Sequence, residues 1–184
     1  MSLKNKIIGA LFGVTALGGG IISVVKHNEG LSQTAYKDSA GVWTICYGET
    51  KGVRKGLYAT QKQCDAQLIQ SITEHAAALE GLPESLPDVV VLGSIDMTYN
   101  IGVYGFKNST IKQLLMKKDY AAAERAVLSW RYITVSSKKY DCSQLVQGKP
   151  NKVCWGLWER RQWQSKAIGN EFKTVQEAVL ALPK

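Results

Sequence analysis

Residues 29–48 read EGLSQTAYKDSAGVWTICYG, and this stretch predicts the end of a helix followed by a β-hairpin. Residues 21–29 are typical of the last turns of a helix, and Gly30 is a common residue just past a helix because glycine tolerates positive φ. Residues 38–41, with Asp first and Gly last, have the composition of a β-turn. The next residues alternate as a β-strand, with Val42, Thr44 and Cys46 on one face and Trp43, Ile45 and Tyr47 on the other.

This order of elements brings three polar side chains to one place. Glu29 lies at the helix end, Asp38 in the turn and Thr44 on the following strand, so the two carboxyl groups can face each other across a cleft. The helix macrodipole disfavours a negative charge at this end, and both the dipole and burial would raise the pKa of Glu29. A general acid with a raised pKa, and a second carboxylate and a hydroxyl that hold water, are the groups that hydrolysis of a glycosidic bond requires.

Length, composition and charge set broad limits. A chain of 184 residues with 45% hydrophobic residues predicts one domain, or one domain with a short appendage, around a buried core. The formal charge of +8 points to an anionic partner: nucleic acid, anionic lipid or the acidic polymers of a bacterial envelope. The Lys and Arg residues are scattered without a nucleic-acid-binding motif, so a solvated basic surface is favoured over a base-reading site.

The four cysteines form no Cys-x-x-Cys pair, and the two histidines are far apart, which argues against a metal site. If the chain leaves the cytosol, pairing of sequence neighbours would join Cys46 to Cys64 and Cys142 to Cys154, each bond stabilising the fold by ~3 kcal/mol. In a reducing cytosol all four would instead be small buried apolar side chains.

The N-terminal segment over residues 7–25 carries no charge and is flanked by Lys4, Lys6 and Lys26. Its length approaches the ~20 residues that cross a bilayer, but its many glycines make it a weak anchor. Three interpretations stay open: a signal peptide cleaved near residues 14–16, an uncleaved and weakly held anchor, or a buried helix of a soluble protein. The first two place the rest of the chain outside the cytosol.

Three segments resemble the phage-type lysozymes of glycoside hydrolase family 24. Residues 29–48 resemble the active-site signature of that family, residues 99–110 resemble its central helix, and residues 156–161 resemble its C-terminal Gly-Leu-x-x-Arg-Arg element. The segments occur in the family's order over residues 21–169, most of the chain. Three ordered motifs are far more specific than one short motif.

The resemblance implies an α+β, mostly helical, two-lobed fold, with a small β-hairpin lobe and a larger helical lobe, and a catalytic domain over residues 26–184. It implies a monomer that hydrolyses the β-1,4 bond between N-acetylmuramic acid and N-acetylglucosamine in peptidoglycan, without cofactor, metal or nucleic acid. Carried over by position, Glu29 is the general acid, Asp38 holds or activates the water and Thr44 helps to fix it. Inversion is expected, with the carboxyl groups roughly 6.5 to 9.5 Å apart.

Three polar residues fall near the implied substrate groove. Asn100 lies in the apolar run over residues 89–101, so it is predicted to be buried and bonded to backbone, with contact to substrate as the less favoured role. Ser109 and Thr110 have two competing roles, as caps of a helix over residues 111–117 and as residues that line the groove.

Two adjacent arginines could pair with Glu29, and the sequence departs from the family pattern at two positions near it. One of Arg160 and Arg161 is expected to supply its counter-charge, and the sequence does not decide which. Cys46 replaces a glycine of the common pattern, which fits pairing with Cys64 in members that mature outside the cytosol. Glu49 adds a third carboxylate and is the alternative acid, although a solvent-facing or salt-bridged role is the simpler interpretation.

Residues 1–25 make the chain similar to family members with an N-terminal signal-anchor-release segment. Such an endolysin is exported to the host periplasm, is first tethered to the inner membrane, and acts on peptidoglycan strands at an anionic envelope surface. Tethering would hold Glu29 at the lipid headgroups and keep the site inactive until release. Two other functions are weighed: a lytic transglycosylase, which needs only the acid, and a non-enzymatic basic protein that binds or disrupts the envelope.

The rest of the chain predicts mainly structural elements. Apolar residues at helical spacing predict helices over residues 60–79, 119–130 and 172–182, the first capped by Thr60. Residues 132–154 lack helical periodicity and predict an irregular surface loop with a turn at residues 148–151. Three tryptophans are expected to pack mainly in the core: Trp155, Trp158 and Trp163.

Overall fold

The computed structural model describes residues 2–38 and 41–183, which form helices and three small antiparallel hairpins. The helices are α1 (Leu3–Phe12), α2 (Ala16–Glu29), α3 (Gln61–His75), the 3-10 helix η1 (Ala76–Leu79), α4 (Asp88–Lys107), α5 (Thr110–Met116), α6 (Tyr120–Leu128), α7 (Trp155–Ile168) and α8 (Val175–Leu180). The strand pairs are β1 (Ser32–Lys37) with β2 (Trp43–Cys46), β3 (Tyr132–Val135) with β4 (Lys138–Asp141), and β5 (Leu145–Val146) with β6 (Lys149–Pro150). The predicted mostly helical α+β class is confirmed.

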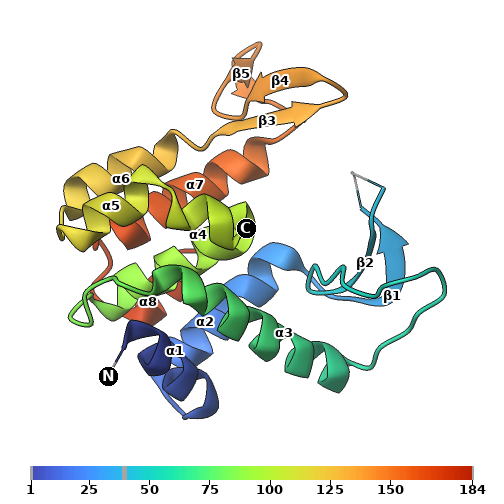
Figure 1. Cartoon of the computed structure of the whole chain (residues 1–184). Coiled ribbons are helices and arrows are strands. Elements are labelled where there is room, and N and C mark those ends of the chain that lie inside the picture. Colours follow the sequence, from blue (N-terminus) through green and yellow to red (C-terminus); the bar gives the residue numbers. More distant parts are fainter. Residues whose placement is uncertain (1, 39–40, 184) are drawn as a thin grey trace.

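The elements form two lobes, which Figure 1 shows side by side. The β1–β2 hairpin and the loop after it form the small lobe, and α3 leads from this lobe back to the helices. In the larger lobe, α4 packs against α2, α3, α7 and α8. Residues 89–98 of α4 are all buried, as their apolar composition predicts.

The apolar N-terminal segment forms two helices rather than one continuous span. α1 and α2 meet at an angle of 83°, and the Thr15 hydroxyl caps α2 by accepting a hydrogen bond from the Gly18 N–H (3.1 Å). A Cβ atom at Gly18 would lie 1.9 Å from the Ala10 carbonyl oxygen, so only glycine allows this close crossing. Ile7 and Ile21 are fully buried, and the segment is part of the core in this structure. By length and composition, this bent pair and α4 could each cross a membrane. Buried core helices of soluble proteins also meet this criterion.

The β1–β2 hairpin is confirmed, with Tyr36 opposite Thr44. The predicted turn closes through a hydrogen bond from the Gly41 N–H to the Asp38 carbonyl oxygen (2.9 Å). Gly41 has a φ of +79°, which explains why glycine occupies the last turn position. Residues 39–40 of the turn lie outside the described residues.

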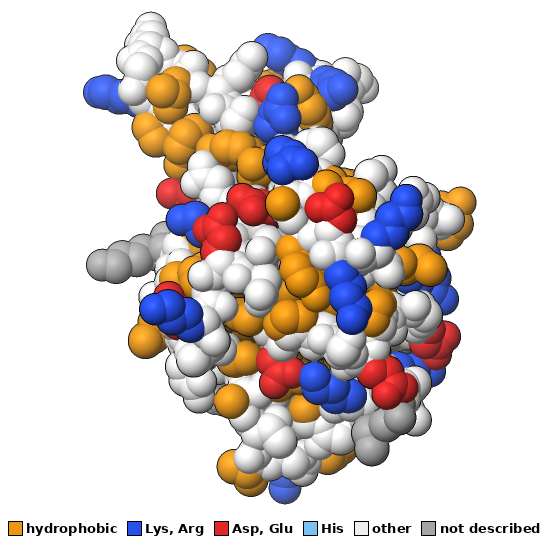
Figure 2. All heavy atoms as spheres, turned by 90° about the vertical axis from the view of Figure 1, so that its left-hand side faces the viewer, with side chains coloured by type: hydrophobic (Ala, Val, Ile, Leu, Met, Phe, Trp, Pro, Cys, Tyr) orange, Lys and Arg blue, Asp and Glu red, His pale blue; other side chains and the backbone are white. Residues whose placement is uncertain are grey.

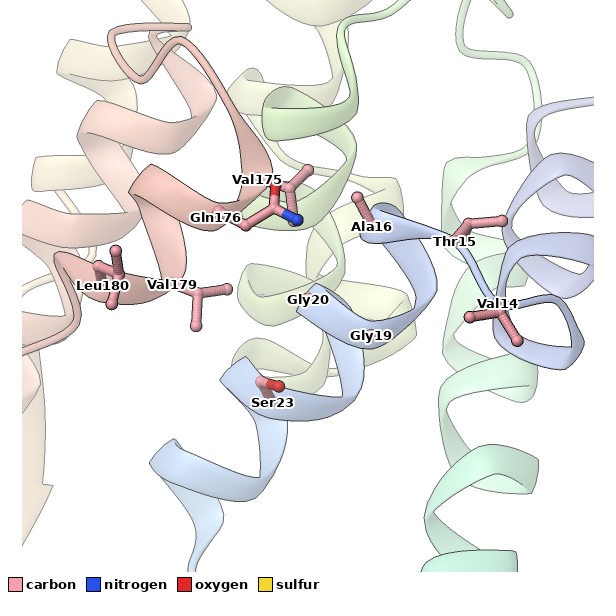
Figure 3. A pocket seen from close by; sticks show the side chains of 10 residues that line it. All are labelled: Val14, Thr15, Ala16, Gly19, Gly20, Ser23, Val175, Gln176, Val179 and Leu180. Carbon is pink, nitrogen blue, oxygen red and sulfur yellow. The ribbon is translucent and has the colours of Figure 1, made fainter.

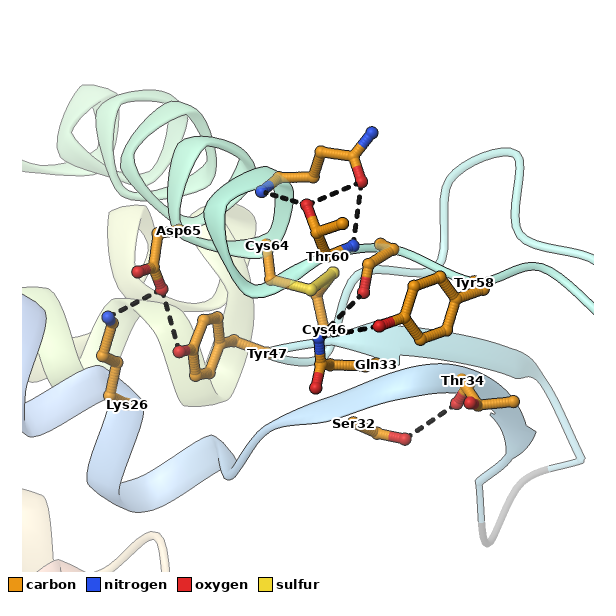
Figure 4. The surroundings of a disulfide bond; sticks show 12 residues. Lys26, Ser32, Gln33, Thr34, Cys46, Tyr47, Tyr58, Thr60, Cys64 and Asp65 are labelled. Atoms are coloured by element: carbon orange, nitrogen blue, oxygen red, sulfur yellow. Dashed lines mark hydrogen bonds and ion pairs between the residues drawn. A yellow bond between two sulfur atoms is a disulfide. The ribbon is translucent and has the colours of Figure 1, made fainter.

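The strand predicted over residues 42–47 is confirmed over Trp43–Cys46, and residues 44–47 are all buried. Cys46 has a φ of +57° and forms a disulfide with Cys64 of α3. The strand therefore ends at Cys46, one residue earlier than predicted, where the disulfide ties it to α3. Figure 4 shows this junction, in which the disulfide joins the small lobe to α3.

The prediction of an irregular loop over residues 132–154 is wrong, since the segment forms the β3–β4 and β5–β6 hairpins. Residues 149–150 were predicted in a turn but form β6, and the turn lies at residues 147–148, which both have positive φ. The Cys142–Cys154 disulfide closes this module, so both cysteine pairs are those of sequence neighbours. The short strands escape detection because exposed hairpins carry mixed residues without regular alternation.

The remaining helix predictions are confirmed with small changes of bounds. Thr60 and Gln63 form a reciprocal capping box at the start of α3. The last helix, α8, packs on α2, and a Cβ atom at Gly20 would lie 2.2 Å from the Val175 side chain. Figure 3 shows the side chains that line the apolar groove between these two helices. Among the three tryptophans predicted to pack in the core, Trp163 is buried and the other two are half-buried.

The charge is distributed over the surface in small groups. Figure 2 shows Lys and Arg side chains interspersed with acidic and apolar ones on the face that it displays. Lys4 pairs with Glu80 (3.0 Å) and Lys6 with Asp88 (2.6 Å), which ties α1 to the helical lobe. Exposed pairs of this kind stabilise a fold by only ~0–1 kcal/mol each, so burial of apolar residues in α1 contributes more.

Candidate active site

Glu29 is the last residue of α2, and Gly30 follows with a φ of +68°, so the predicted helix end is confirmed. The Glu29 side chain is 22% exposed. It opens into a hollow of about 320 Å³ where the end of α2 meets the β1–β2 hairpin, lined also by Gly30, Leu31, Ser32, Tyr36 and Cys46. A Cβ atom at Gly48 would lie 3.6 Å from Glu29 Oε2, so the small lobe approaches the carboxyl group from the side of β2.

One arginine joins Glu29 to a second, fully buried carboxylate. Arg160 of α7 donates a hydrogen bond from Nη2 to Glu29 Oε1 (2.9 Å). The same nitrogen donates to Oδ1 of Asp96 in α4 (2.8 Å), and Arg160 Nε donates to Asp96 Oδ2 (3.2 Å). Arg160 therefore supplies the counter-charge that the sequence could not assign to one arginine of the pair.

Two amides complete the bonding of Asp96. Asn28 Nδ2 donates to Asp96 Oδ1 (2.9 Å), and Gln164 Nε2 donates to Asp96 Oδ2 (2.6 Å). Each oxygen of Asp96 thus accepts two hydrogen bonds, the pattern of an ionised carboxylate. The cluster joins α2, α4 and α7 directly behind Glu29.

Arg161 has a separate role next to this cluster. Its guanidinium donates to Asn100 Oδ1 (2.5 Å), to Gln164 Oε1 (2.5 Å) and to the Trp130 carbonyl oxygen (2.9 Å). Burial, and then the neighbouring charge of Arg160, lower the pKa of Arg161 to about 10. Arg161 therefore stays cationic at neutral pH and fixes the orientation of the Gln164 amide.

The pKa of the Glu29 carboxyl is raised above its ordinary value, and burial is the largest cause. The charge and hydrogen bond of Arg160 lower this pKa, and the negative charge of Asp96 raises it. His75 of α3, which stacks on Tyr99 with ring centroids 4.6 Å apart, lowers it weakly. Burial outweighs the arginine, so Glu29 holds its proton to a higher pH than an exposed glutamate.

Asp38 and Thr44 lie on the hairpin that faces Glu29. Asp38 Oδ1 accepts a hydrogen bond from the Val42 N–H (2.8 Å), which fixes the carboxylate at the head of the turn. The Thr44 hydroxyl donates to the Val42 carbonyl oxygen (3.1 Å) and retains lone pairs that can accept from water. Tyr36, the cross-strand partner of Thr44, lines the same hollow as Glu29.

The alternative acid, Glu49, has a local structural contact. Its Oε1 accepts hydrogen bonds from the Thr50 N–H (2.9 Å) and the Lys51 N–H (2.8 Å). These bonds stabilise the turn after β2, and they favour a structural role over proton transfer.

Charged and covalent links fix the small lobe against α2 and α3. Lys26 of α2 pairs with Asp65 of α3 (2.7 Å), and the Tyr47 hydroxyl donates to the same carboxylate (2.9 Å). Figure 4 shows this pair beside the Cys46–Cys64 disulfide. Glu29 lies three residues after Lys26, so the same contacts hold the helix end near the hairpin.

The three residues predicted near the substrate have different positions. The prediction that Asn100 is buried and bonded to backbone is wrong: it is exposed and bonded to Arg161, because the continuous buried run of α4 covers only residues 89–98. Ser109 is buried and caps α5, its hydroxyl accepting a backbone hydrogen bond (3.1 Å), so the capping role is confirmed for it. Thr110 is the exposed first residue of α5, and a groove role for these residues stays a prediction.

Three residues of this cluster were not predicted from the sequence: Asp96, Asn28 and Gln164. Asp96 is the only charged residue within residues 89–101, and this was a usable signal because a buried aspartate is almost always paired. Gln164 lies four residues after Arg160 and thus on the same face of α7. The identity of their shared partner depends on helix packing that no local pattern encodes.

The two lobes place a buried, protonatable glutamate at a helix end opposite a hairpin that carries a second carboxylate. Such a pair of carboxyl groups, one with a pKa raised by burial and one in a polar setting, suits acid-assisted attack of water on a glycosidic bond. The fold and the site define the class as a lysozyme-like glycoside hydrolase.

Comparison with known proteins is specific at the family level. The model of the phage lysozyme family matches residues 26–164, and the chain belongs to this family. The chain is 30% identical over 129 residues to an endolysin of Acyrthosiphon pisum secondary endosymbiont phage 1, covering 67% of this chain and 86% of that one. It is 29% identical over 178 residues to a SAR-endolysin of Escherichia phage N15, covering 90% of this chain and 95% of that one. The protein is therefore an endolysin-type lysozyme, whose substrate is peptidoglycan.

Solved structures agree with this assignment. An endolysin from Escherichia coli phage FAHEc1 superposes with a TM-score of 0.71 at 25% identity, covering 87% of this chain and 97% of that one. The muramidase domain of SpmX from Asticaccaulis excentricus has a TM-score of 0.64 at 24% identity, covering 80% of this chain and 93% of that one. It has a fold similar to that of this chain.

Proposed function

We propose that Glu29 is the general acid in hydrolysis of the β-1,4 bond between N-acetylmuramic acid and N-acetylglucosamine. The supporting observation is a largely buried carboxyl group at the hollow beside the β1–β2 hairpin, with Oε1 held by Arg160 (2.9 Å). Among the described residues, none donates a hydrogen bond to Oε2, so this oxygen can carry the proton. The raised pKa of Glu29 keeps that proton available for the leaving sugar oxygen.

Asp38 and Thr44 act on the attacking water in this proposal. Asp38 takes a proton from the water, whose oxygen forms the new bond to the sugar carbon, while Glu29 gives its proton to the departing oxygen. The hydrogen bond from the Val42 N–H to Asp38 Oδ1 (2.8 Å) supports this role, because it holds the carboxyl group at the head of the turn. The Thr44 hydroxyl orients the water from the neighbouring strand position.

This arrangement predicts inversion at the sugar carbon. Water held by Asp38 attacks from the face opposite the leaving group, so the first product formed from the β-linked strand is the α-anomer. Proton NMR of the sugar ends released from purified peptidoglycan, recorded before the anomers equilibrate, measures this outcome. A β-anomer formed first would assign Asp38 as a nucleophile and contradict its role on water, and absence of new sugar ends would contradict hydrolysis itself.

The N-terminal segment is proposed to tether the newly made protein to the inner membrane, with the catalytic domain exported to the host periplasm as a monomer. The Escherichia phage N15 relative bears the name SAR-endolysin, and residues 7–25 are uncharged here as an anchor requires. Ile21, Val24 and Val25 are fully buried in the folded domain. The same side chains cannot face lipid and the core at once, so the tethered form lacks the assembled site and is inactive.

Substitution Gly19→Leu tests the tether without disturbing the fold. Gly19 is exposed on α2, and a Cβ atom there would meet nothing within 4 Å, so the folded domain accepts a larger side chain. The added apolar surface is expected to increase the membrane-bound share of the protein and delay lysis. Cell fractionation with a muralytic assay on each fraction measures both effects. Full activity of the membrane-embedded fraction would contradict the proposal.

A further inference from the structure

The proposed acid is bonded to an arginine, and a guanidinium normally keeps a carboxyl group ionised. We propose that Asp96 is a positioning residue that holds Arg160 and neutralises its charge, so that Arg160 can hydrogen-bond Glu29 without stripping its proton. This inference rests on the proposed role of Glu29 as general acid. It extends that role to a residue that touches neither substrate nor water.

The geometry assigns Arg160 primarily to Asp96. Arg160 gives Asp96 two hydrogen bonds, from Nη2 (2.8 Å) and from Nε (3.2 Å), but gives Glu29 only one, from Nη2 (2.9 Å). The Asp96 side chain is 0% exposed, whereas that of Glu29 is 22% exposed. The buried ion pair is therefore Arg160 with Asp96, and Glu29 is a third member at its open edge.

The partners of Asp96 show that it supplies a full negative charge. Both of its oxygens accept two hydrogen bonds, from Arg160, Asn28 and Gln164, and a proton on either oxygen would face a donor. The Gln164 amide cannot simply turn over, because its Oε1 accepts a bond from Arg161. This arrangement fits an ionised Asp96 and would be disrupted by a neutral acid.

The charges then determine the state of Glu29. With Asp96 ionised, the Arg160–Asp96 pair is neutral, and deprotonation of Glu29 would place a net negative charge in a largely buried site. Without the charge on Asp96, Arg160 would be the nearest unbalanced charge to Glu29 and would favour its carboxylate form. Asp96 thus lets Arg160 hold Glu29 in place by a hydrogen bond without also favouring the ionised form of Glu29.

Other charged and titratable groups near Glu29 have weaker effects on it or are bonded to other partners. From α3, His75 lowers the Glu29 pKa weakly, and it is stacked on Tyr99 of α4. From α7, Arg161 is engaged by Asn100, Gln164 and the Trp130 carbonyl oxygen. From the small lobe, Asp38 accepts a hydrogen bond from the Val42 N–H, and Glu49 is bonded to its own turn. In the described part of the chain, none of these groups hydrogen-bonds to Arg160 as Asp96 does.

The test is the pH dependence of peptidoglycan hydrolysis. Glu29 acts in its protonated form, so the rate falls as pH rises through its pKa. Asp96→Asn keeps the shape of the side chain and removes its charge, and it is expected to move this alkaline limb down by about one pH unit or more. The rate at neutral pH then falls about tenfold relative to the maximal rate of the same variant, which is reached at lower pH.

A charge swap provides rescue in the same cluster. Asp96→Asn combined with Gln164→Glu exchanges carboxylate and amide across one hydrogen bond (2.6 Å), and the alkaline limb is expected to return toward the wild-type position. Thr98→Val is the matched control, because it removes a different buried hydrogen bond of α4, to the Ser94 carbonyl oxygen (2.7 Å). This control is expected to lower thermal stability and leave the limb in place.

The outcomes separate this inference from the proposed function. If Asp96→Asn lowers the rate equally at every pH, Asp96 is merely structural and the inference is overturned. If Glu29→Gln retains activity, the proposed acid itself is wrong. NMR titration of Glu29 in the wild-type protein needs no variant: ionisation above the ordinary glutamate range is expected, and a Glu29 that titrates at or below that range would overturn the inference even if no Asp96 variant folds.

Discussion

Glu29→Gln is expected to lower the rate of peptidoglycan hydrolysis by roughly 10²–10⁴-fold, the range that a positioned general acid contributes. The glutamine carbonyl oxygen can accept the Arg160 hydrogen bond that Glu29 Oε1 accepts now (2.9 Å), so the fold is retained while the transferable proton is lost. Release of soluble fragments from purified peptidoglycan measures the rate, and thermal unfolding verifies the fold.

Glu49→Gln is the matched control for this loss. Its side chain can keep accepting the turn hydrogen bonds from Thr50 and Lys51, and the variant is expected to retain most activity. A large loss in Glu49→Gln with an active Glu29→Gln variant would transfer the acid role to Glu49. Lysis of cells at the wild-type rate by Glu29→Gln would instead support the non-enzymatic function, in which the basic, partly apolar chain disrupts the envelope.

Arg160→Met is expected to have the largest effect on stability. The substitution leaves Asp96, which is 0% exposed, without a cationic partner, and breaking a buried ion pair in this way costs about 3–5 kcal/mol of unfolding free energy. Urea denaturation of the wild type and the variant measures the difference.

A double variant checks the cause of that loss. In Arg160→Met with Asp96→Leu no buried charge is left unpaired, so much of the stability is expected to return although the muralytic site is impaired. If the double variant is as unstable as the single one, packing of the Arg160 stem is the main contribution and the account of the ion pair is wrong.

The helix end and the hairpin could be predicted because both depend on local chemistry. Gly30 and Gly41 have positive φ values of +68° and +79°, and these requirements are visible in the sequence itself. The placement of Glu29 at the end of α2 and of Asp38 at the head of the turn follows from the same local signals. These two positions carry most of the proposed chemistry.

The cluster behind Glu29 could not be predicted in the same way. Arg160 is 131 residues from Glu29 and 64 from Asp96 along the chain, and their meeting depends on how α2, α4 and α7 pack. The choice between Arg160 and Arg161 is decided by which side of α7 faces α2, and Asn100 is exposed because the buried run of α4 ends at residue 98. Adjacent residues on a helix point about 100° apart, so packing separates their roles completely.

The errors in secondary structure have distinct physical causes. Residues 7–25 have one continuous apolar composition, but the Thr15 cap and the close approach at Gly18 bend them into two helices that pack as core. Residues 132–154 form exposed hairpins that a disulfide stabilises. These strands bury no apolar face, so their sequence lacks the alternating pattern of a half-buried strand. Composition alone describes neither case.

The most direct test of the account is digestion of purified peptidoglycan in water enriched in heavy oxygen, by the wild type and by Glu29→Gln, followed by mass spectrometry of the fragments. The account predicts that wild-type enzyme releases hydrated sugar ends carrying one heavy oxygen per cleaved bond, and that Glu29→Gln releases almost none. Unlabelled anhydro ends from the wild type would identify a lytic transglycosylase, and labelled ends from Glu29→Gln at the wild-type rate would contradict Glu29 as the acid.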